Sequence, residues 1–168
     1  MKKQNRHGSA KVTLPSDREI EITRQFDASA ALIYKAWTTP ELVKRWWGFD
    51  SSEWLVCEID LRVGGQWRYV TREEGGYEVG FHGEYRELDA PRRLVQTEVF
   101  EGIPVTEDSG ALDTITFEEQ DGVTTMTINV LHSCKEHRDM HIASGMEGGM
   151  QISMNRLEDA VRALEYAA

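Results

Sequence analysis

The feature that most constrains the fold is a change of hydrophobic period along the chain. Between about residues 52 and 131, apolar and polar residues alternate in short runs, as in Trp54–Ile59. After residue 133 the apolar residues instead recur every three or four positions up to the C-terminus. Alternation indicates half-buried strands, and the longer spacing indicates an amphipathic helix. The sequence therefore predicts a meander of strands followed by one long C-terminal helix.

Turn signals divide the alternating part into about seven strands. The expected strands are 19–26, 52–59, 66–72, 77–88, 94–100, 114–118 and 123–131. Asp121-Gly122, between two alternating runs, is a strong hairpin signal. Two short helices, about 30–37 and 40–47, are expected after the first strand. Asp27 or Ser29 can cap the first, and Pro40 suits the first turn of the second.

This order of elements predicts an α+β helix-grip architecture. A twisted antiparallel sheet has one face to bury, and only one long helix is available to cover its concave side. A helix about 10 Å across does not fill such a trough. We therefore expect a cavity between sheet and helix, closed at one end by the two short helices. Residues 1–16 are expected to form a disordered arm, and residues 17–168 a single domain.

Charge and composition narrow the classes of function. The 168-residue chain has 19 basic and 29 acidic residues, a formal charge of -10. An acidic surface repels phosphate backbones and anionic lipid, so we expect no nucleic-acid or membrane partner. No apolar run is long enough to span a bilayer, and the N-terminal MKKQNRHGSAK lacks the apolar run of a secretory signal. We expect a cytoplasmic protein, monomeric or homodimeric, whose Cys57 and Cys134 are free thiols.

Four motifs resemble a known family. They are WTTPELVKRWW at 37–47, DLRVGGQW at 60–67, GEYRELDAPRRL at 83–94, and EHRD at 136–139 continued by GMEGGM at 145–150. In this order the chain resembles the START-like (SRPBCC, helix-grip) superfamily. It is most similar to the branch named after the C-terminal domain of the heat shock protein 90 ATPase activator. The resemblance implies the helix-grip fold; the superfamily includes lipid and hormone carriers and polyketide cyclases, so it does not by itself imply one activity.

Large apolar side chains are the candidates for lining the cavity. Tryptophan buries a large area, and methionine adapts to irregular volumes, although both also occur in ordinary cores. Trp67 and Tyr69 should share the inward face of their strand, with Arg68 exposed. The candidate ligand-binding residues are Trp37, Trp46, Trp54, Trp67, Tyr69, Phe81, Tyr85, Met126, Met146 and Met150.

Catalytic and metal motifs are not evident in the sequence. His137 and His141, four residues apart beside Cys134 and Glu136, have the types of zinc ligands. The stretch HRDMH lacks the glutamate of a metalloprotease motif, and we predict neither metal nor cofactor. No nucleophile motif, phosphate loop or dinucleotide signature is present, so no catalytic residue is assigned. A polar side chain inside the cavity, such as Asn129, Thr127 or Glu98, could still polarise a substrate.

Three functions follow as alternatives. The first is binding of a small hydrophobic or amphipathic molecule in the cavity. The second is an enzyme of polyketide cyclase or hydrolase type that uses the same cavity, which would require inward-facing ionisable groups of perturbed pKa. The third is a chaperone co-factor or protein-interaction role, in which the acidic surface meets a basic partner.

Overall fold

The structure is a computed structural model that describes residues 3–102 and 110–167. The sequence forms eight strands and four helices in this part of the chain. The elements in chain order are β1 (Lys11–Thr13), β2 (Glu19–Phe26), α1 (Ala30–Thr38), α2 (Pro40–Trp46), β3 (Glu53–Ile59), β4 (Gln66–Arg72), β5 (Glu78–Asp89), β6 (Arg93–Phe100), β7 (Ala111–Gln120), β8 (Val123–Leu131), α3 (Lys135–Ala143) and α4 (Met146–Ala167).

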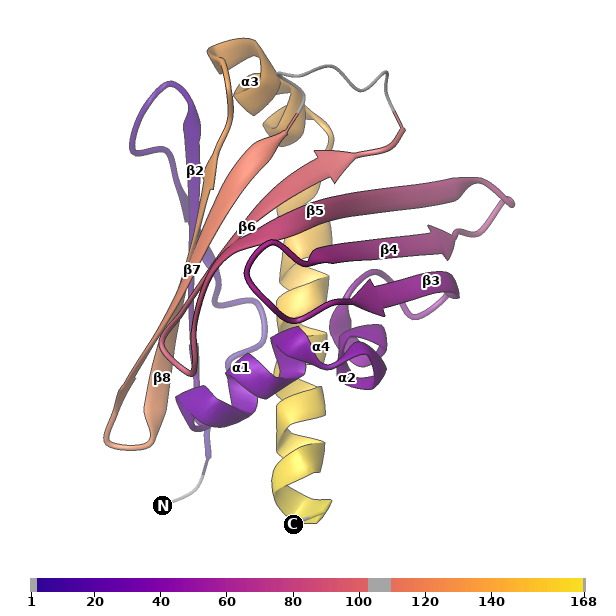
Figure 1. Cartoon of the computed structure of the whole chain (residues 1–168). Coiled ribbons are helices and arrows are strands. Elements are labelled where there is room, and N and C mark those ends of the chain that lie inside the picture. The colour runs from indigo at the N-terminus through magenta and orange to yellow at the C-terminus, as the bar shows by residue number, and fades with distance from the viewer. Residues whose placement is uncertain (1–2, 103–109, 168) are drawn as a thin grey trace.

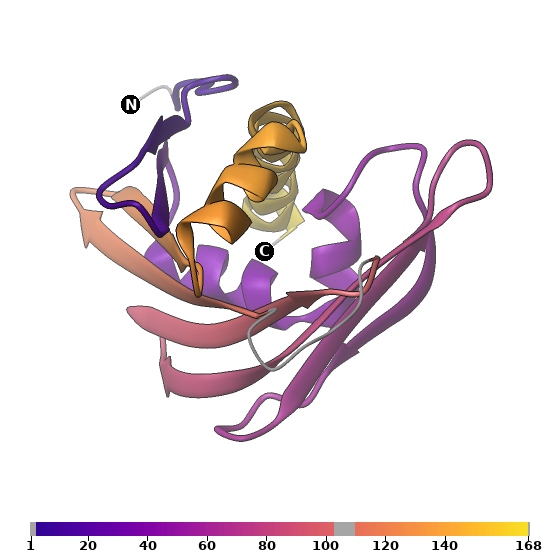
Figure 2. The ribbon, with the colours of Figure 1, turned by 90° about the horizontal axis from the view of Figure 1, so that it is seen from above.

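The strands form one antiparallel sheet that curves around the C-terminal helix. Their order across the sheet is β1-β2-β8-β7-β6-β5-β4-β3. Figures 1 and 2 show α4 lying against the concave side, with α1 and α2 beside it. The predicted α+β helix-grip architecture is confirmed, with one strand more than the expected seven. No helix of the described residues is both long and apolar enough to cross a membrane.

The additional strand lies in the segment predicted to be a disordered arm. In β1, Lys11 pairs with Thr23 of β2 in antiparallel register. The arm is also tied to α4, because Gln151 donates a hydrogen bond to the carbonyl of Ala10 at 2.7 Å. The prediction was wrong for residues 3–16. Three strand residues show too little alternation to be recognised, and their pairing depends on the open edge of β2.

The predicted C-terminal helix is divided into two. The break follows Ser144, and Gly145 has a φ of 81°, a backbone conformation that glycine adopts without steric cost. Ile142 is consequently 37% exposed and does not join the buried stripe of α4. The apolar period continues across the break, so it does not reveal the change of helix direction.

Local signals elsewhere are matched by the structure. The Ser29 hydroxyl accepts a hydrogen bond from the Leu32 amide and caps α1. Asp121 and Gly122 both have positive φ, as a type I′ hairpin requires. Trp67 is 2% exposed and Tyr69 is buried, whereas Arg68 is exposed. The expected strand register of β4 is therefore confirmed.

The main core lies between the sheet and the C-terminal half of α4. Ile115 of β7 and Met126 of β8 are fully buried, as are Leu157 and Val161 of α4. The N-terminal half of α4 does not pack against the sheet in this way. The space under it is the cavity described next.

Candidate functional site

A cavity of about 370 Å³ lies between the N-terminal half of α4 and the strands opposite. Met146, Met150 and Met154 of α4 line one side. The sheet contributes side chains from β2, β4, β5, β6, β7 and β8, and α1 and α2 close one end. The volume falls in the range of small-molecule sites in proteins.

An aromatic cluster around Trp47 forms the wall near α2. The ring of Trp47 lies 5.6 Å from Trp54, 5.5 Å from Tyr69 and 5.3 Å from Phe81, measured between centroids. Edge-on and tilted arrangements at these distances are favourable for aromatic rings. The wall is thus built from α2 and three neighbouring strands.

Trp46 and Trp47 both line the cavity, although neighbours on a helix point about 100° apart. Trp46 is the last residue of α2, and its indole donates a hydrogen bond to the carbonyl of Ala36 at 3.0 Å. Trp47 already has an extended backbone, with φ of -76° and ψ of 135°. Because the helix ends between them, the two indoles can face the same space, which the sequence did not reveal.

Seven of the ten candidate residues line this cavity, and three lie elsewhere. The seven are Trp37, Trp46, Trp67, Tyr69, Phe81, Met146 and Met150. Trp54 belongs to the aromatic cluster, 5.6 Å from Trp47 and 5.9 Å from Tyr69, but does not itself line the cavity. Tyr85 and Met126 are packed in the core with exposures of 1% and 0%. Alternation gives the face of a strand, but it does not show where along that face the cavity ends.

Gly83 of β5 allows Trp67 to reach its position. A Cβ atom at Gly83 would lie 1.8 Å from the Thr97 carbonyl oxygen and 2.6 Å from Trp67 Nε1. The indole crosses the glycine and donates a hydrogen bond to that carbonyl at 3.2 Å. Gly83 is therefore needed for close packing rather than for ligand space.

Polar side chains gather at the end of the cavity toward α3. Gln96 and Glu98 of β6 and Asp113 of β7 line it from the sheet, and His141 lines it from α3. Gln96 and Asp113 are direct cross-strand partners, so their side chains share a face of the sheet. These four residues, called the polar end below, combine two carboxyl groups, an amide and an imidazole.

Asp113 is the most unusual residue of the polar end. It is 3% exposed, and its Oδ1 atom is buried with no hydrogen-bond partner in the described structure. Burial raises the pKa of Asp113 well above its ordinary value; the nearby Glu98 carboxyl raises the pKa further, and a hydrogen bond from Gln96 opposes the rise. A carboxyl group in these surroundings retains its proton far more readily than one in water.

His141 of the polar end is paired with His132, and burial disfavours the charged form of both rings. His141 Nδ1 lies 3.0 Å from His132 Nε2, a hydrogen bond between the two rings. Burial lowers the pKa of His132 to about 4. Burial also lowers the pKa of His141, while the charge of Glu98 opposes this shift. Both rings line a second cavity of about 410 Å³ that shares Phe81 and Met146 with the first.

The polar candidates named from the sequence have different positions. Glu98 lines the cavity, whereas Asn129 hydrogen-bonds to Glu19 and Glu21. Ile128 and Val130 line the cavity, so their neighbours Thr127 and Asn129 point to the other face.

The conceivable zinc ligands do not come together. His141 pairs with His132, while His137 Nδ1 lies 3.0 Å from the Ser133 hydroxyl. Cys134 occupies the N-cap position of α3 without a side-chain capping bond.

Comparison with known proteins identifies the family. The model of the family described as Activator of Hsp90 ATPase homolog 1-like protein matches residues 27–162. The chain belongs to this family. No curated protein matches it.

Solved structures share the fold of this family member. A Rhodobacter sphaeroides protein is 24% identical with a TM-score of 0.82, covering 92% of this chain and 99% of its own. An Arthrobacter aurescens protein is 23% identical with a TM-score of 0.81, covering 91% of each chain. An AHSA1-like protein from Aeromonas hydrophila is 19% identical with a TM-score of 0.65, covering 86% of this chain and 94% of its own.

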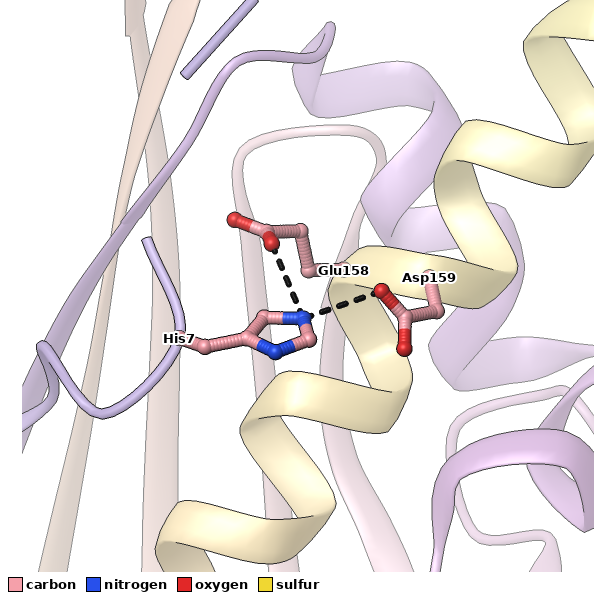
Figure 3. A group of neighbouring side chains, drawn as sticks. All are labelled: His7, Glu158 and Asp159. Atoms are coloured by element: carbon pink, nitrogen blue, oxygen red, sulfur yellow. Dashed lines mark hydrogen bonds and ion pairs between the residues drawn. The ribbon is translucent and has the colours of Figure 1, made fainter. Parts of the chain in front are cut away.

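A second group of ionisable residues lies outside the cavity, where His7 of the N-terminal segment meets Glu158 and Asp159 of α4 (Figure 3). His7 Nε2 is 2.9 Å from Asp159 Oδ1 and 3.2 Å from Glu158 Oε2, the latter at ion-pair distance without hydrogen-bond geometry. Glu158 Oε1 also accepts hydrogen bonds from the Arg6 amide at 3.0 Å and from Arg24 at 3.2 Å. Within the described residues this is the only group of three such side chains close enough to share a metal ion. Arg24 already supplies a positive charge to Glu158, so no metal ion is needed there. We interpret the group as a clamp, a set of bonds between α4 and the N-terminal segment that fixes this segment in place.

A depression of about 600 Å³ lies outside the sheet at the turn between β3 and β4. Its lining includes Asp60 and Arg62, which form an exposed ion pair at 2.9 Å. The motif DLRVGGQW thus forms a turn here, and Gly65 is needed in it because a Cβ would lie 2.0 Å from the Asp60 carbonyl oxygen. Exposed ion pairs contribute little, and no site is inferred at this turn.

Proposed function

We propose that this protein binds a small amphipathic molecule in the cavity between the sheet and α4. The observation that supports this most is unfilled space of about 370 Å³ beneath a helix whose other half is tightly packed. The cavity opens to solvent past the exposed residues Phe49 and Tyr77, so a small molecule can enter it. Aromatic and methionine walls with a few polar groups at one end suit a molecule with an apolar body and a polar head.

A cavity-filling substitution tests this proposal. Dodecanol is a suitable probe, with tryptophan fluorescence as the readout because Trp37, Trp46 and Trp47 line the space. We expect saturable binding to the wild type and loss of binding in Met150→Trp. The matched control is Ile152→Trp, at an exposed position of the same helix. Equal binding to all three proteins, or binding to none, would refute the proposal.

An enzyme that uses the same cavity is the second candidate, because of Asp113. A carboxyl group with a raised pKa in an apolar site can act as a general acid or base near neutral pH. Such an enzyme of cyclase or hydrolase type would lose turnover in Asp113→Asn and keep it in Glu118→Gln, an exposed position of the same strand. A panel of activated esters, assayed with both variants, is the first test. Turnover that survives Asp113→Asn would rule out this role for Asp113.

A chaperone or other protein partner stays a prediction. The formal charge of -10 would favour a basic surface on that partner. Capture from a native lysate at low salt, where electrostatic attraction is strongest, tests it. Recovery of no stoichiometric partner would count against this role.

A further inference from the structure

We propose that the polar end of the cavity binds the protonated amino group of an amphipathic amine, whose apolar part lies along the aromatic and methionine walls. The inference rests on the proposed function, because it names the class of molecule that the same cavity binds. It depends on an unsatisfied acceptor, on the balance of charge around it and on the walls beside it.

The unsatisfied acceptor is Oδ1 of Asp113. A buried carboxylate oxygen without a partner costs free energy, and few native groups remain in that state. Glu98 and Gln96 hydrogen-bond to the same side chain, yet this oxygen stays unpaired in the described structure. Asp113 lines the cavity, and although Oδ1 itself is covered in this structure, a turn of the side chain toward the cavity would expose it to a donor on a bound molecule.

The balance of charge specifies a cationic donor. Among the described residues that line the two adjoining cavities, Glu73, Glu98 and Asp113 carry carboxyl groups, and none is a lysine or arginine. His132 and His141 do not compensate, because burial lowers the pKa of both rings; the third histidine, His137, lines only the second cavity and lies beside the Ser133 hydroxyl. Two carboxyl groups side by side with no basic side chain among the lining residues favour a positively charged partner. An ammonium group supplies both the missing positive charge and N–H donors.

The walls and the overall charge favour the same class of molecule. Trp47, Tyr69 and Phe81 line the cavity and offer the apolar part of such a molecule an aromatic surface. The formal charge of -10 raises the local concentration of cations around the protein. A fatty acid would instead place a third carboxylate near Glu98 and Asp113, where like charges repel.

Three probes with the same chain separate the possibilities. Dodecylamine, dodecanol and dodecanoate share an apolar tail and differ in the charge of the head. Titrations below the micelle concentration, followed by tryptophan fluorescence and calorimetry at neutral pH, give their dissociation constants. We expect dodecylamine to bind the wild type about tenfold or more tightly than dodecanol, as a charge-assisted hydrogen bond allows. Dodecanoate should bind weakest.

Two variants assign the preference to the polar end. Asp113→Asn should remove most of the preference for dodecylamine and leave the binding of dodecanol within about twofold, since the apolar walls are unchanged. Glu98→Gln should reduce the preference as a second, independent change. Glu118→Gln, on the exposed face of β7, removes the same charge and should keep the preference.

Each outcome distinguishes the inference from the proposed function. If dodecanol binds the cavity but dodecylamine shows no preference, or if dodecanoate binds tightest, the inference is wrong and the proposed function stands. If none of the probes binds, both fail. If dodecylamine binds Met150→Trp, in which the cavity is filled, as tightly as wild type, it binds the acidic surface, and that result also overturns the inference.

Discussion

Two carboxylates are buried to nearly the same degree in this protein, and their surroundings differ. Glu158 of α4 is 4% exposed and Asp113 of β7 is 3% exposed. Glu158 contacts Arg24, whose side chain is fully buried, and accepts a bond from the Arg6 amide. Asp113 faces a cavity and has a second carboxyl group, not a guanidinium, beside it, although each of the two residues has one buried oxygen without a hydrogen-bond partner in the described structure. Burial alone therefore does not separate a structural carboxylate from a functional one; the neighbouring charge does.

Because of this difference, removing the carboxyl group of Glu158 and removing that of Asp113 should change the stability of the protein in opposite directions. Removing one member of a buried ion pair leaves the other charge buried without compensation, which is strongly destabilising. Removing a buried carboxylate that has no cationic partner relieves a cost instead. Residues kept for binding or catalysis are often unfavourable for stability in this way. The predictions below test this contrast, beginning with the largest expected effect.

Glu158→Ala should lower the free energy of unfolding by about 3–5 kcal/mol, because Arg24 would remain buried without its partner. Urea denaturation measures the change. Asp159→Ala, at the neighbouring position with a side chain 60% exposed, is the control and should stay within about 0.5 kcal/mol. If Glu158→Ala lowers the free energy of unfolding by less than about 1 kcal/mol, the Glu158 ion pair does not stabilise the fold, and the contrast with Asp113 fails.

Trp67→Ala tests the apolar wall of the cavity. We expect this wall to stabilise the fold, in contrast to the polar end of the same cavity. The side chain is 2% exposed, and we expect a loss of about 3 kcal/mol, at the lower end for tryptophan because one side already faces a cavity. Arg68→Ala should cost about 0.5 kcal/mol, since its ion pair with Glu101 is largely exposed. If the urea midpoint falls more in Arg68→Ala, the wall does not carry the stability assigned to it.

Asp113→Asn should stabilise the protein at neutral pH, by roughly 1–2 kcal/mol. The folded-state pKa of Asp113 is raised, so in the wild type its contribution is favourable below the unfolded pKa of about 3.9 and is lost as pH rises through the folded pKa. Glu98, His141 and His132 also face this region and are present in both proteins. The difference between variant and wild type should therefore grow from about pH 4 upward and then level off. Melting temperatures of the wild type and Asp113→Asn from pH 4 to 8, with Glu118→Gln as control, measure this difference. If Asp113→Asn is less stable than the wild type at every pH, the contrast between Asp113 and Glu158 is wrong.

His7→Ala should have the smallest effect, a loss within about 0.5 kcal/mol. Its side chain is 37% exposed, and Glu158 keeps Arg24 and the Arg6 amide when the imidazole is removed. The melting temperatures of His7→Ala and Glu158→Ala, measured under the same conditions, show how much each of the two residues contributes to stability. A loss as large as that of Glu158→Ala would mean that His7, rather than Arg24, compensates the buried carboxylate.

Much of the fold could be predicted from the sequence because hydrophobic period reports which face of an element is buried. The register of Trp67, the cap at Ser29 and the hairpin at Asp121-Gly122 are local properties, and all three match the structure. Strand β1 and the break at Gly145 were missed. Strand β1 depends on pairing with β2, which is separated from it in the sequence. The break at Gly145 interrupts the helix without changing the period of its apolar residues.

The site was predicted less completely, for two physical reasons. Asp113 is in phase with buried Ala111, Ile115 and Phe117, but the strand was predicted to begin at Thr114, which left Asp113 outside it. Extending the alternation by one position, from Thr114 to Asp113, would have placed Asp113 on the inward face. His132 and His141 meet only because α3 turns back over the end of β8, a tertiary contact with no sequence signal.

The most direct test of the account is a crystal structure of the protein with dodecylamine. We expect the nitrogen within hydrogen-bonding distance of Asp113 Oδ1, and the chain along Met146, Met150 and Trp47. Density for the chain with its nitrogen directed away from Asp113, or a cavity that stays empty while the amine binds the outer surface, would contradict the account.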